Sequence, residues 1–284
     1  MDPASSTVPF SIQKIADQTP TLIQVEDLVA VEEPLEIRLE WQDGEGNQVK
    51  KTVSITMRTP GNDFDLALGF LFTEGILRNR SEVEEIRHCG PVLNLAQSQN
   101  IVLVRMKRGL ELDLSRLERH FYTSSSCGVC GKASIEALRI QSPYSSKDGW
   151  PQTRWNAMQI SQFPEVLRRA QTAFNQTGGL HASGLFSANG ELLIVREDVG
   201  RHNALDKLIG HCFANNQLPL NQSLLLVSGR ASFELIQKAS MAGIPTIAAV
   251  GAPSSLAVEL ARELDLTLLG FVKPSRLNIY HEGP

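Results

Sequence analysis

The chain has 284 residues, of which 42% are hydrophobic and 20% charged, so it has the length and composition of a globular protein with a substantial core. Its formal net charge of −4 argues against general nucleic-acid binding, which needs a basic surface. No apolar run reaches the roughly 18 residues that a membrane span needs, and residues 1–20 lack the apolar segment of a signal peptide. We therefore expect a cytoplasmic protein that binds neither membranes nor nucleic acid.

The N-terminal part of the chain is predicted to be a mobile tail over residues 1–20, followed by a small α+β domain over residues 21–120. Residues 22–58 alternate between apolar and polar side chains, as strands do, and the sequence DGEGN at 43–47 predicts a turn between two strands. The spacing of apolar residues predicts a helix and then two further strands, at 63–75, 83–86 and 101–106.

The C-terminal part, residues 155–284, is predicted to be an α/β domain. Before it, residues 121–154 hold a cysteine pair, a predicted helix and, at 141–154, a linker rich in Ser and Pro. Strands are expected at 184–186, 192–195, 224–227, 246–250 and 266–271, and helices at 163–174, 203–213, 233–242 and 254–264. This alternation indicates parallel βαβ crossovers, and the run LLLV at 224–227 is typical of a strand buried on both faces.

Three of the predicted strand-to-helix turns combine glycine with hydroxyl or basic residues, at 196–203, 228–232 and 251–255. In an open parallel sheet such turns meet at the carboxyl edge, where the N–H groups of the helix starts favour anions such as phosphate. The alternative is that Asn203, Ser232 and Ser254 in these turns are ordinary helix caps. The chain has neither the glycine motif of dinucleotide-binding folds nor a P-loop.

The last predicted strand runs into an aromatic residue and two cations, Phe271, Lys273 and Arg276. As a ligand site, this run would stack its ring on a base and place its cations on phosphates. The alternative is a solvated segment.

Four cysteines are present: Cys89, Cys127, Cys130 and Cys212. Four in a chain of this length do not form a disulfide scaffold, which fits a reducing compartment. Cys127 and Cys130 precede a predicted helix over 132–138, and a thiol at a helix start beside Lys132 has a lowered pKa. Because the thiolate is the reactive form, this placement favours attack on a sulfur donor.

The cysteine pair leaves other chemistries open. A structural zinc site needs four ligands, for which only His88 and Cys89 are at hand. A thioredoxin-like dithiol is expected after the first strand of its own βαβ pattern. A zinc deaminase needs His-x-Glu before the cysteines, whereas His181 follows them and is not followed by that Glu. We expect His181 to be a structural histidine or to line a cavity, and Cys212 to pack in the core.

Five stretches together resemble the formate dehydrogenase accessory sulfurtransferase family, of the FdhD/NarQ type. They are SSCGVCGK at 125–132, TGGLHASG at 177–184, REDVGRHNALDK at 196–207, SGR at 228–230 and ASMAGIP at 239–245. The resemblance runs from about residue 22 to 280. It implies an α/β fold, with a cytidine-deaminase-like three-layer C-terminal domain and a smaller α+β N-terminal domain.

The resemblance also implies a function. Such proteins take persulfide sulfur from a cysteine desulfurase and pass it to the molybdenum cofactor, in its bis(molybdopterin guanine dinucleotide) form, before insertion into formate dehydrogenase. They act as homodimers without a catalytic metal of their own. The competing hypothesis is a non-enzymatic chaperone that binds the same cofactor and carries no sulfur.

By position in the family's motifs, Cys127 corresponds to the persulfide-bearing residue and Cys130 to its partner. The cofactor-contacting segment corresponds to Phe271, Val272, Lys273, Pro274, Ser275 and Arg276. An Arg is usual in the family where this chain has Lys273, and a Lys cannot make the same bidentate contact with phosphate.

Overall fold

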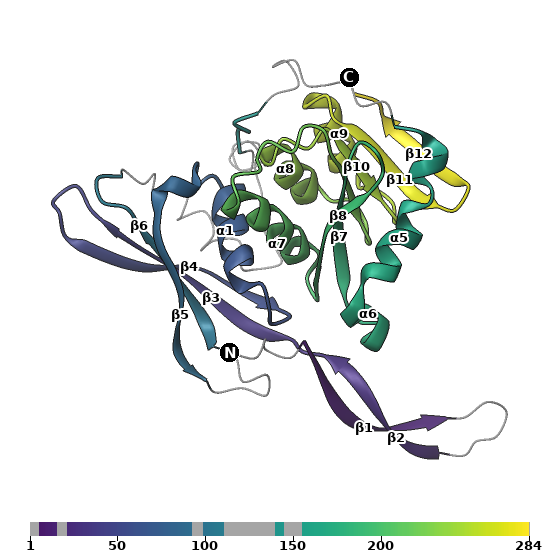
Figure 1. Cartoon of the computed structure of the whole chain (residues 1–284), viewed down its shortest axis with the longest axis horizontal. Coiled ribbons are helices and arrows are strands. Elements are labelled where there is room, and N and C mark those ends of the chain that lie inside the picture. Colours follow the sequence, from purple (N-terminus) through teal and green to yellow (C-terminus); the bar gives the residue numbers. More distant parts are fainter. Residues whose placement is uncertain (1–5, 16–21, 93–98, 111–139, 145–154, 284) are drawn as a thin grey trace.

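The computed structural model describes residues 6–15, 22–92, 99–110, 140–144 and 155–283. These residues form three β-sheets: a two-stranded ribbon, a four-stranded sheet and a six-stranded sheet (Figure 1). None of the helices in these ranges is both long and apolar enough to cross a membrane. Cys127 and Cys130, together with the predicted helix that follows them, lie outside the described residues.

The four-stranded sheet has the order β4-β3-β6-β5. Its strands are β3 (Glu33–Gln42), β4 (Gln48–Arg58), β5 (Val83–Val92) and β6 (Gln99–Met106). Between them lie α1 (Asp63–Thr73) and the short 3-10 helix η1 (Arg80–Glu82). The alternation read from the sequence is confirmed, because Leu35, Ile37 and Leu39 of β3 all face the core. The turn at 43–47 joins β3 to β4 as predicted.

The six-stranded sheet has the order β12-β11-β10-β9-β7-β8. Its strands are β7 (His181–Phe186), β8 (Leu192–Asp198), β9 (Leu224–Val227), β10 (Thr246–Ala249), β11 (Thr267–Lys273) and β12 (Arg276–His281). Strands β9, β10 and β11 are parallel, as predicted, whereas β7 is antiparallel to both β8 and β9. The carboxyl ends of β8 to β11 therefore share one edge with the start of β7. Strand β12, which the sequence analysis did not predict, returns antiparallel to β11.

Helices cover both faces of this sheet. They are α4 (Ala157–Ile160), α5 (Phe163–Ala170), α6 (Thr172–Thr177), α7 (Arg201–Ala214), α8 (Phe233–Met241) and α9 (Ser255–Glu263). In β9, Leu225 and Val227 pack into one apolar cluster and Leu224 and Leu226 into another, so the predicted doubly buried strand is confirmed. The first cluster also contains α1 and the inner face of the four-stranded sheet.

Helices α1 and α7 cross with their backbones in direct contact. A Cβ atom on Gly69 would overlap the carbonyl group of Asp206, and one on Gly210 would overlap that of Asp65. The two backbones touch because glycine has no side chain at either position. This crossing places α1 and the four-stranded sheet directly on the helical layer of the larger sheet (Figure 1).

The helix predicted over 163–174 is two helices, α5 and α6, which separate at Gln171. Gln171 leaves the helical conformation with φ −79° and ψ 87°. The carboxylate of Glu197 on β8 then accepts hydrogen bonds from the N–H groups of Ala173 and Phe174, at 3.0 and 2.8 Å. The first N–H groups of α6 are thus bound by a residue of a distant strand. The spacing of apolar residues in 163–174 therefore gave no sign of the break.

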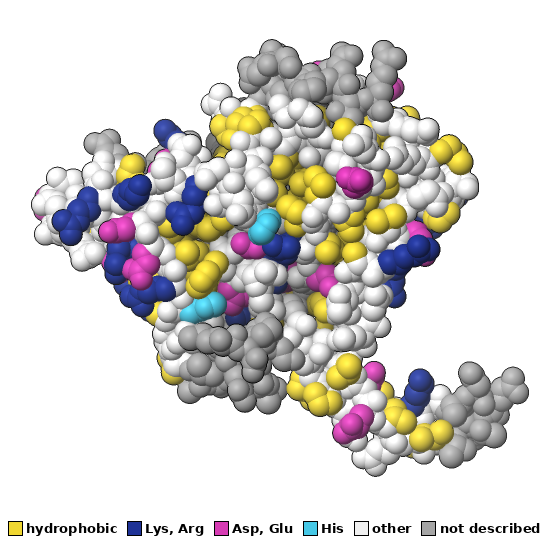
Figure 2. All heavy atoms as spheres, viewed as in Figure 1, with side chains coloured by type: hydrophobic (Ala, Val, Ile, Leu, Met, Phe, Trp, Pro, Cys, Tyr) yellow, Lys and Arg dark blue, Asp and Glu magenta, His cyan; other side chains and the backbone are white. Residues whose placement is uncertain are grey.

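The N-terminal region differs from the expectation of a mobile tail over residues 1–20. Thr7–Ile15 forms strand β1, which pairs antiparallel with β2 (Leu22–Ala30) over nine residues of each strand. The ribbon projects from the body and carries exposed apolar side chains, among them Phe10 and Ile15 (Figures 1 and 2). The predicted boundaries at residues 20, 120 and 154 fall outside the described residues and stay predictions.

Candidate functional site

The three strand-to-helix turns meet at the carboxyl edge of the six-stranded sheet, as predicted. The N–H of Gly251 donates to the carbonyl of Gly229 at 3.0 Å, and the N–H of Phe271 donates to the carbonyl of Gly251 at 3.0 Å. A Cβ on Gly251 would lie 3.0 Å from the carbonyl oxygen of Gly229, a tight contact, so glycine favours this close approach of the two turns. The turns after β9, β10 and β11 thus form one continuous floor of backbone.

The three suggested helix caps have different roles. Ser254 is an ordinary cap, whose hydroxyl accepts the N–H of Ala257 at 3.2 Å. Ser232 makes no cap bond and instead lies 3.2 Å from Nε2 of His202. Asn203 lies in the first turn of α7, where its side chain donates to the carbonyl of Met57 at 2.7 Å.

The motif at 196–207 is largely a buried junction between the two sheets. Asp198 is fully buried and forms an ion pair with Lys207, with 2.7 Å between Oδ2 and Nζ. Both residues also bond Thr59: its N–H donates to Asp198 at 3.1 Å and its carbonyl accepts from Lys207 at 2.8 Å. Because the charged atoms of Asp198 and Lys207 have close partners, these two residues hold β4 against α7 and are not free for a ligand.

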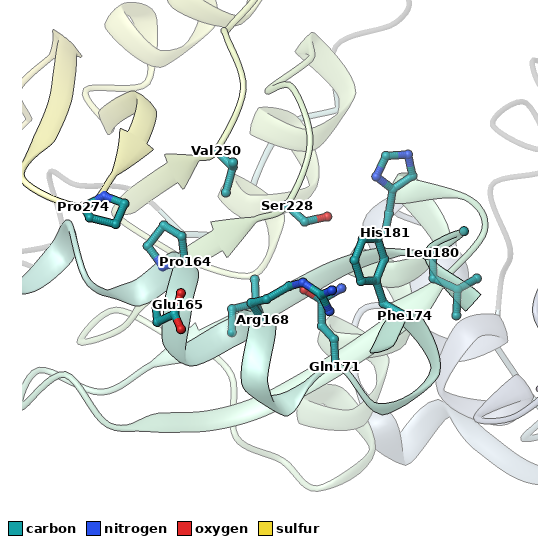
Figure 3. Close-up of a pocket in the computed structure, with 13 residues that line it drawn as sticks. Pro164, Glu165, Arg168, Gln171, Phe174, Leu180, His181, Ser228, Val250 and Pro274 are labelled. Atoms are coloured by element: carbon teal, nitrogen blue, oxygen red, sulfur yellow. The ribbon is translucent and has the colours of Figure 1, made fainter. Parts of the chain in front are cut away.

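A cavity of about 540 Å³ opens beside the same edge (Figure 3). Helices α5 and α6 form one wall, and the start of β7 together with the turns after β9 and β10 forms the other. Its lining residues are Pro164, Glu165, Leu167, Arg168, Gln171, Phe174, Gly178, Gly179, Leu180, His181, Ser228, Val250 and Pro274. The lining is mainly apolar with a few polar groups, which is the usual composition of a small-molecule site.

Histidines at this edge are held in the neutral form. Burial lowers the pKa of His181, and the positive charge of Arg201 lowers it further. Burial and the same arginine lower the pKa of His202 to about 4, against the attraction of Glu234. A neutral imidazole can donate and accept hydrogen bonds without adding charge. The expectation that His181 lines a cavity is confirmed.

The segment 271–276 lies where β11 turns into β12, and its Pro274 is part of the cavity wall. Val272 is fully buried, whereas Lys273 and Arg276 are exposed and neither makes an ion pair with any residue that the structure describes. Phe271 and Ser275 have positive φ angles of 52° and 62°, which fold the segment tightly over the edge. Two unpaired cations therefore stand beside the cavity mouth.

Among the other cysteines, Cys212 is a core residue as predicted: it is fully buried on α7, and burial raises the pKa of its thiol to about 12. Cys89 is half-buried on β5, and its neighbour His88 lies 3.2 Å from the carboxylate of Asp63. Within the described ranges, no three His, Cys, Asp or Glu side chains are grouped so as to hold a metal ion.

A family model for the FdhD/NarQ family matches residues 30–283 of the chain. The chain belongs to this family. It is 52% identical over 258 residues to the sulfur carrier protein FdhD of Mycolicibacterium paratuberculosis, covering 89% of this chain and 90% of that one. It is 50% identical over 255 residues to the protein of the same name from Streptomyces coelicolor, covering 89% of this chain and 87% of that one.

A solved structure extends the likeness to the fold. The crystal structure of a protein assigned as a formate dehydrogenase accessory protein, from Desulfotalea psychrophila, superimposes with a TM-score of 0.69. The match covers 98% of this chain and 97% of that one at 23% identity. The mixed α/β architecture with several sheets is therefore that of a known structure.

In this FdhD/NarQ family member, sequence motifs predict one side of the site and give no sign of the other. The edge turns, Lys273 and Arg276 were predicted and lie together. The cavity wall formed by Arg168, Gln171 and Phe174 was missed, since their helical segment shows no motif and meets the edge only through the tertiary fold.

Proposed function

We propose that this protein is a sulfur carrier that serves the maturation of formate dehydrogenase. The observation that carries the proposal is membership of the FdhD/NarQ family, with relatives about 50% identical that are named sulfur carrier proteins. The protein acts in the cytoplasm as a homodimer, and its larger sheet with helices on both faces corresponds to the layers of a cytidine deaminase.

The working group of the proposed carrier is the Cys127 thiolate. It attacks the outer sulfur of a persulfide on a cysteine desulfurase. A new S–S bond forms on Cys127, the S–S bond of the donor breaks, and the donor cysteine leaves as a thiolate. Cys130 is the CxxC partner of this residue. The outer sulfur is then passed to molybdenum in the bis(molybdopterin guanine dinucleotide) cofactor, which this protein binds as its substrate. In this step the S–S bond on Cys127 breaks, Cys127 leaves as a thiolate, and reduced molybdenum supplies the two electrons that bring the sulfur to the sulfide level.

The carboxyl edge of the six-stranded sheet is the proposed binding place of that cofactor. Its diphosphate groups need cations and N–H donors, and its guanine bases need an apolar cavity. Lys273 and Arg276 provide exposed, unpaired charge beside the backbone floor, within the proposed cofactor segment 271–276. The adjoining cavity of about 540 Å³ has the size of a small-molecule site.

Genetic complementation tests this function against the chaperone alternative. In a host lacking its own FdhD protein, the wild-type chain restores formate dehydrogenase activity and Cys127→Ser does not. Equal activity with Cys127→Ser would favour a chaperone that binds the cofactor without carrying sulfur. Stoichiometric zinc in the purified protein would instead favour the alternative that it is a metal-binding relative of the zinc deaminases.

A further inference from the structure

Gln171 is the buried polar group at the cavity that the fold leaves unsatisfied. The residue is 3% exposed, and its Nε2 is buried without a hydrogen-bond partner among the residues that the structure describes. Gln171 lines the cavity. Buried amide donors are almost always paired, so an unpaired one at a cavity wall indicates an acceptor that arrives with a ligand.

The surroundings of Gln171 fit a flat, largely apolar ligand. Phe174 follows it on α6, and the guanidinium of Arg168 stands over the Phe174 ring, 4.2 Å from its centre. Leu180 and Val250 add apolar surface to the same cavity. A planar aromatic group can pack against such a wall.

The polar groups of the cavity favour a ligand that accepts hydrogen bonds. The hydroxyl oxygen of Ser228 already accepts the N–H of Ala182 at 2.8 Å, so its own proton is free to donate. Among the described lining residues the one carboxylate is that of Glu165, which is largely exposed and is paired with Arg169 at 3.2 Å. In the part of the chain that the structure describes, no acidic group inside the cavity therefore competes for the amide of Gln171.

Different residues line the two ends of the cavity. Gln171 and Phe174 lie toward one end and Pro274 toward the other, as Figure 3 shows. Pro274 stands between Lys273 and Arg276, on the turn that carries both unpaired cations. A nucleotide whose phosphates meet these cations would direct its base along the cavity toward Gln171.

We propose that Gln171 is a specificity-determining residue that donates its amide N–H to the 6-oxo group of a purine base. An adenine would place its 6-amino donor against the same amide donor and would be disfavoured. The inference rests on the proposed function, because it assumes that the bound cargo carries a guanine nucleotide.

Calorimetric titration with GDP, IDP and ADP tests this assignment on the full-length protein. Wild type is expected to bind GDP and IDP at least tenfold more tightly than ADP, since both share the 6-oxo group. In Gln171→Glu, which keeps the size but loses the donor, GDP and IDP affinity falls at least tenfold while ADP affinity does not fall. Gln176→Glu, the same substitution at an exposed position of α6 outside the cavity lining, is the matched control and leaves all three affinities unchanged.

The outcomes separate the two proposals. If Gln171→Glu binds GDP as tightly as wild type, the role of Gln171 is wrong and the nucleotide-binding site stands. If wild type binds none of the three nucleotides, the nucleotide part of the proposed function fails as well. Should Gln171→Glu not fold, as judged by its melting curve, the wild-type preference decides alone, because equal binding of ADP and GDP overturns the proposal.

Discussion

Two charged regions of this protein look alike in sequence and differ in the structure. The stretch at 196–207 and the segment at 271–276 both combine Arg or Lys with small residues after a strand. In the first, Asp198 and Lys207 are buried and fully paired. In the second, Lys273 and Arg276 are exposed without an ion pair among the described residues. Partners within the fold therefore distinguish charges that hold the molecule together from charges that are available to a ligand.

Breaking the buried pair should have the largest effect on stability. Lys207→Met leaves the carboxylate of Asp198 buried without its partner, which is expected to lower the free energy of unfolding by about 3–5 kcal/mol. Urea denaturation of the purified protein measures this loss. Lys50→Met, at an exposed position on β4, is the control and should change the stability by less than about 0.5 kcal/mol. A similar small change for Lys207→Met would contradict a structural role for the motif.

The crossing of α1 and α7 supports the same junction. A substitution there should have the next largest effect on stability. Gly69→Ala inserts a methyl group where the carbonyl of Asp206 already lies, so the helices must separate. Overpacking of this kind costs about 1–3 kcal/mol. Thermal unfolding should show the loss for Gly69→Ala and not for Gly44→Ala, whose added methyl group meets open space. Equal melting temperatures would mean that the helices do not pack this closely.

The exposed cations should show the opposite behaviour. Lys273→Ala with Arg276→Ala removes charge that no described residue pairs with, so stability should stay within about 0.5 kcal/mol of wild type. Binding of GDP and of pyrophosphate should weaken about tenfold or more, since hydrogen bonds to charged groups contribute about 1.5–3 kcal/mol. The exposed pair Lys107→Ala with Arg108→Ala, at the end of β6, is the control of equal charge.

A single substitution sharpens this comparison. Lys273→Arg introduces a planar guanidinium that can contact phosphate through two N–H groups and should tighten pyrophosphate binding severalfold. Weaker or unchanged binding would place the phosphate contact elsewhere on the edge.

The smallest expected effect concerns pH. The pKa of His202 is about 4 in the folded protein, because burial and Arg201 disfavour its charged form, and is about 6.5 when the chain is unfolded. Between these values only the unfolded state takes up the proton, so stability falls as the pH drops from about 6.5 to about 4. In His202→Gln this part of the decline should be absent, and melting temperatures measured across that range should fall less than in wild type.

The sequence was sufficient for features that depend on local patterns. Alternation predicted β3 and β4, helical spacing predicted α7 to α9, and the turns after β8, β9 and β10 converge as parallel connections require. Features made by distant contacts were not predictable. The break at Gln171 depends on a carboxylate from β8, and ribbon β1–β2 depends on the pairing of β2 with residues 7–15, which were predicted to be part of a mobile tail.

The same limit explains the candidate site. The turn at 196–203 was predicted to lie at a ligand edge, and its sequence gave no sign that Asp198 is buried against Thr59, a residue far away in the chain. The unsatisfied amide of Gln171 became visible only when α5 and α6 were placed against the sheet. Cys127 and Cys130 were singled out from their motif and lie outside the described residues, so their role remains a prediction.

The central claim, that sulfur travels on Cys127, is tested most directly by trapping the persulfide. The purified protein is incubated with a cysteine desulfurase and cysteine, alkylated, and digested for mass spectrometry. The account predicts one additional sulfur on the peptide that contains Cys127 in the wild type, and none on the protein in Cys127→Ala. Labile sulfur on Cys127→Ala at the wild-type level would contradict the assignment.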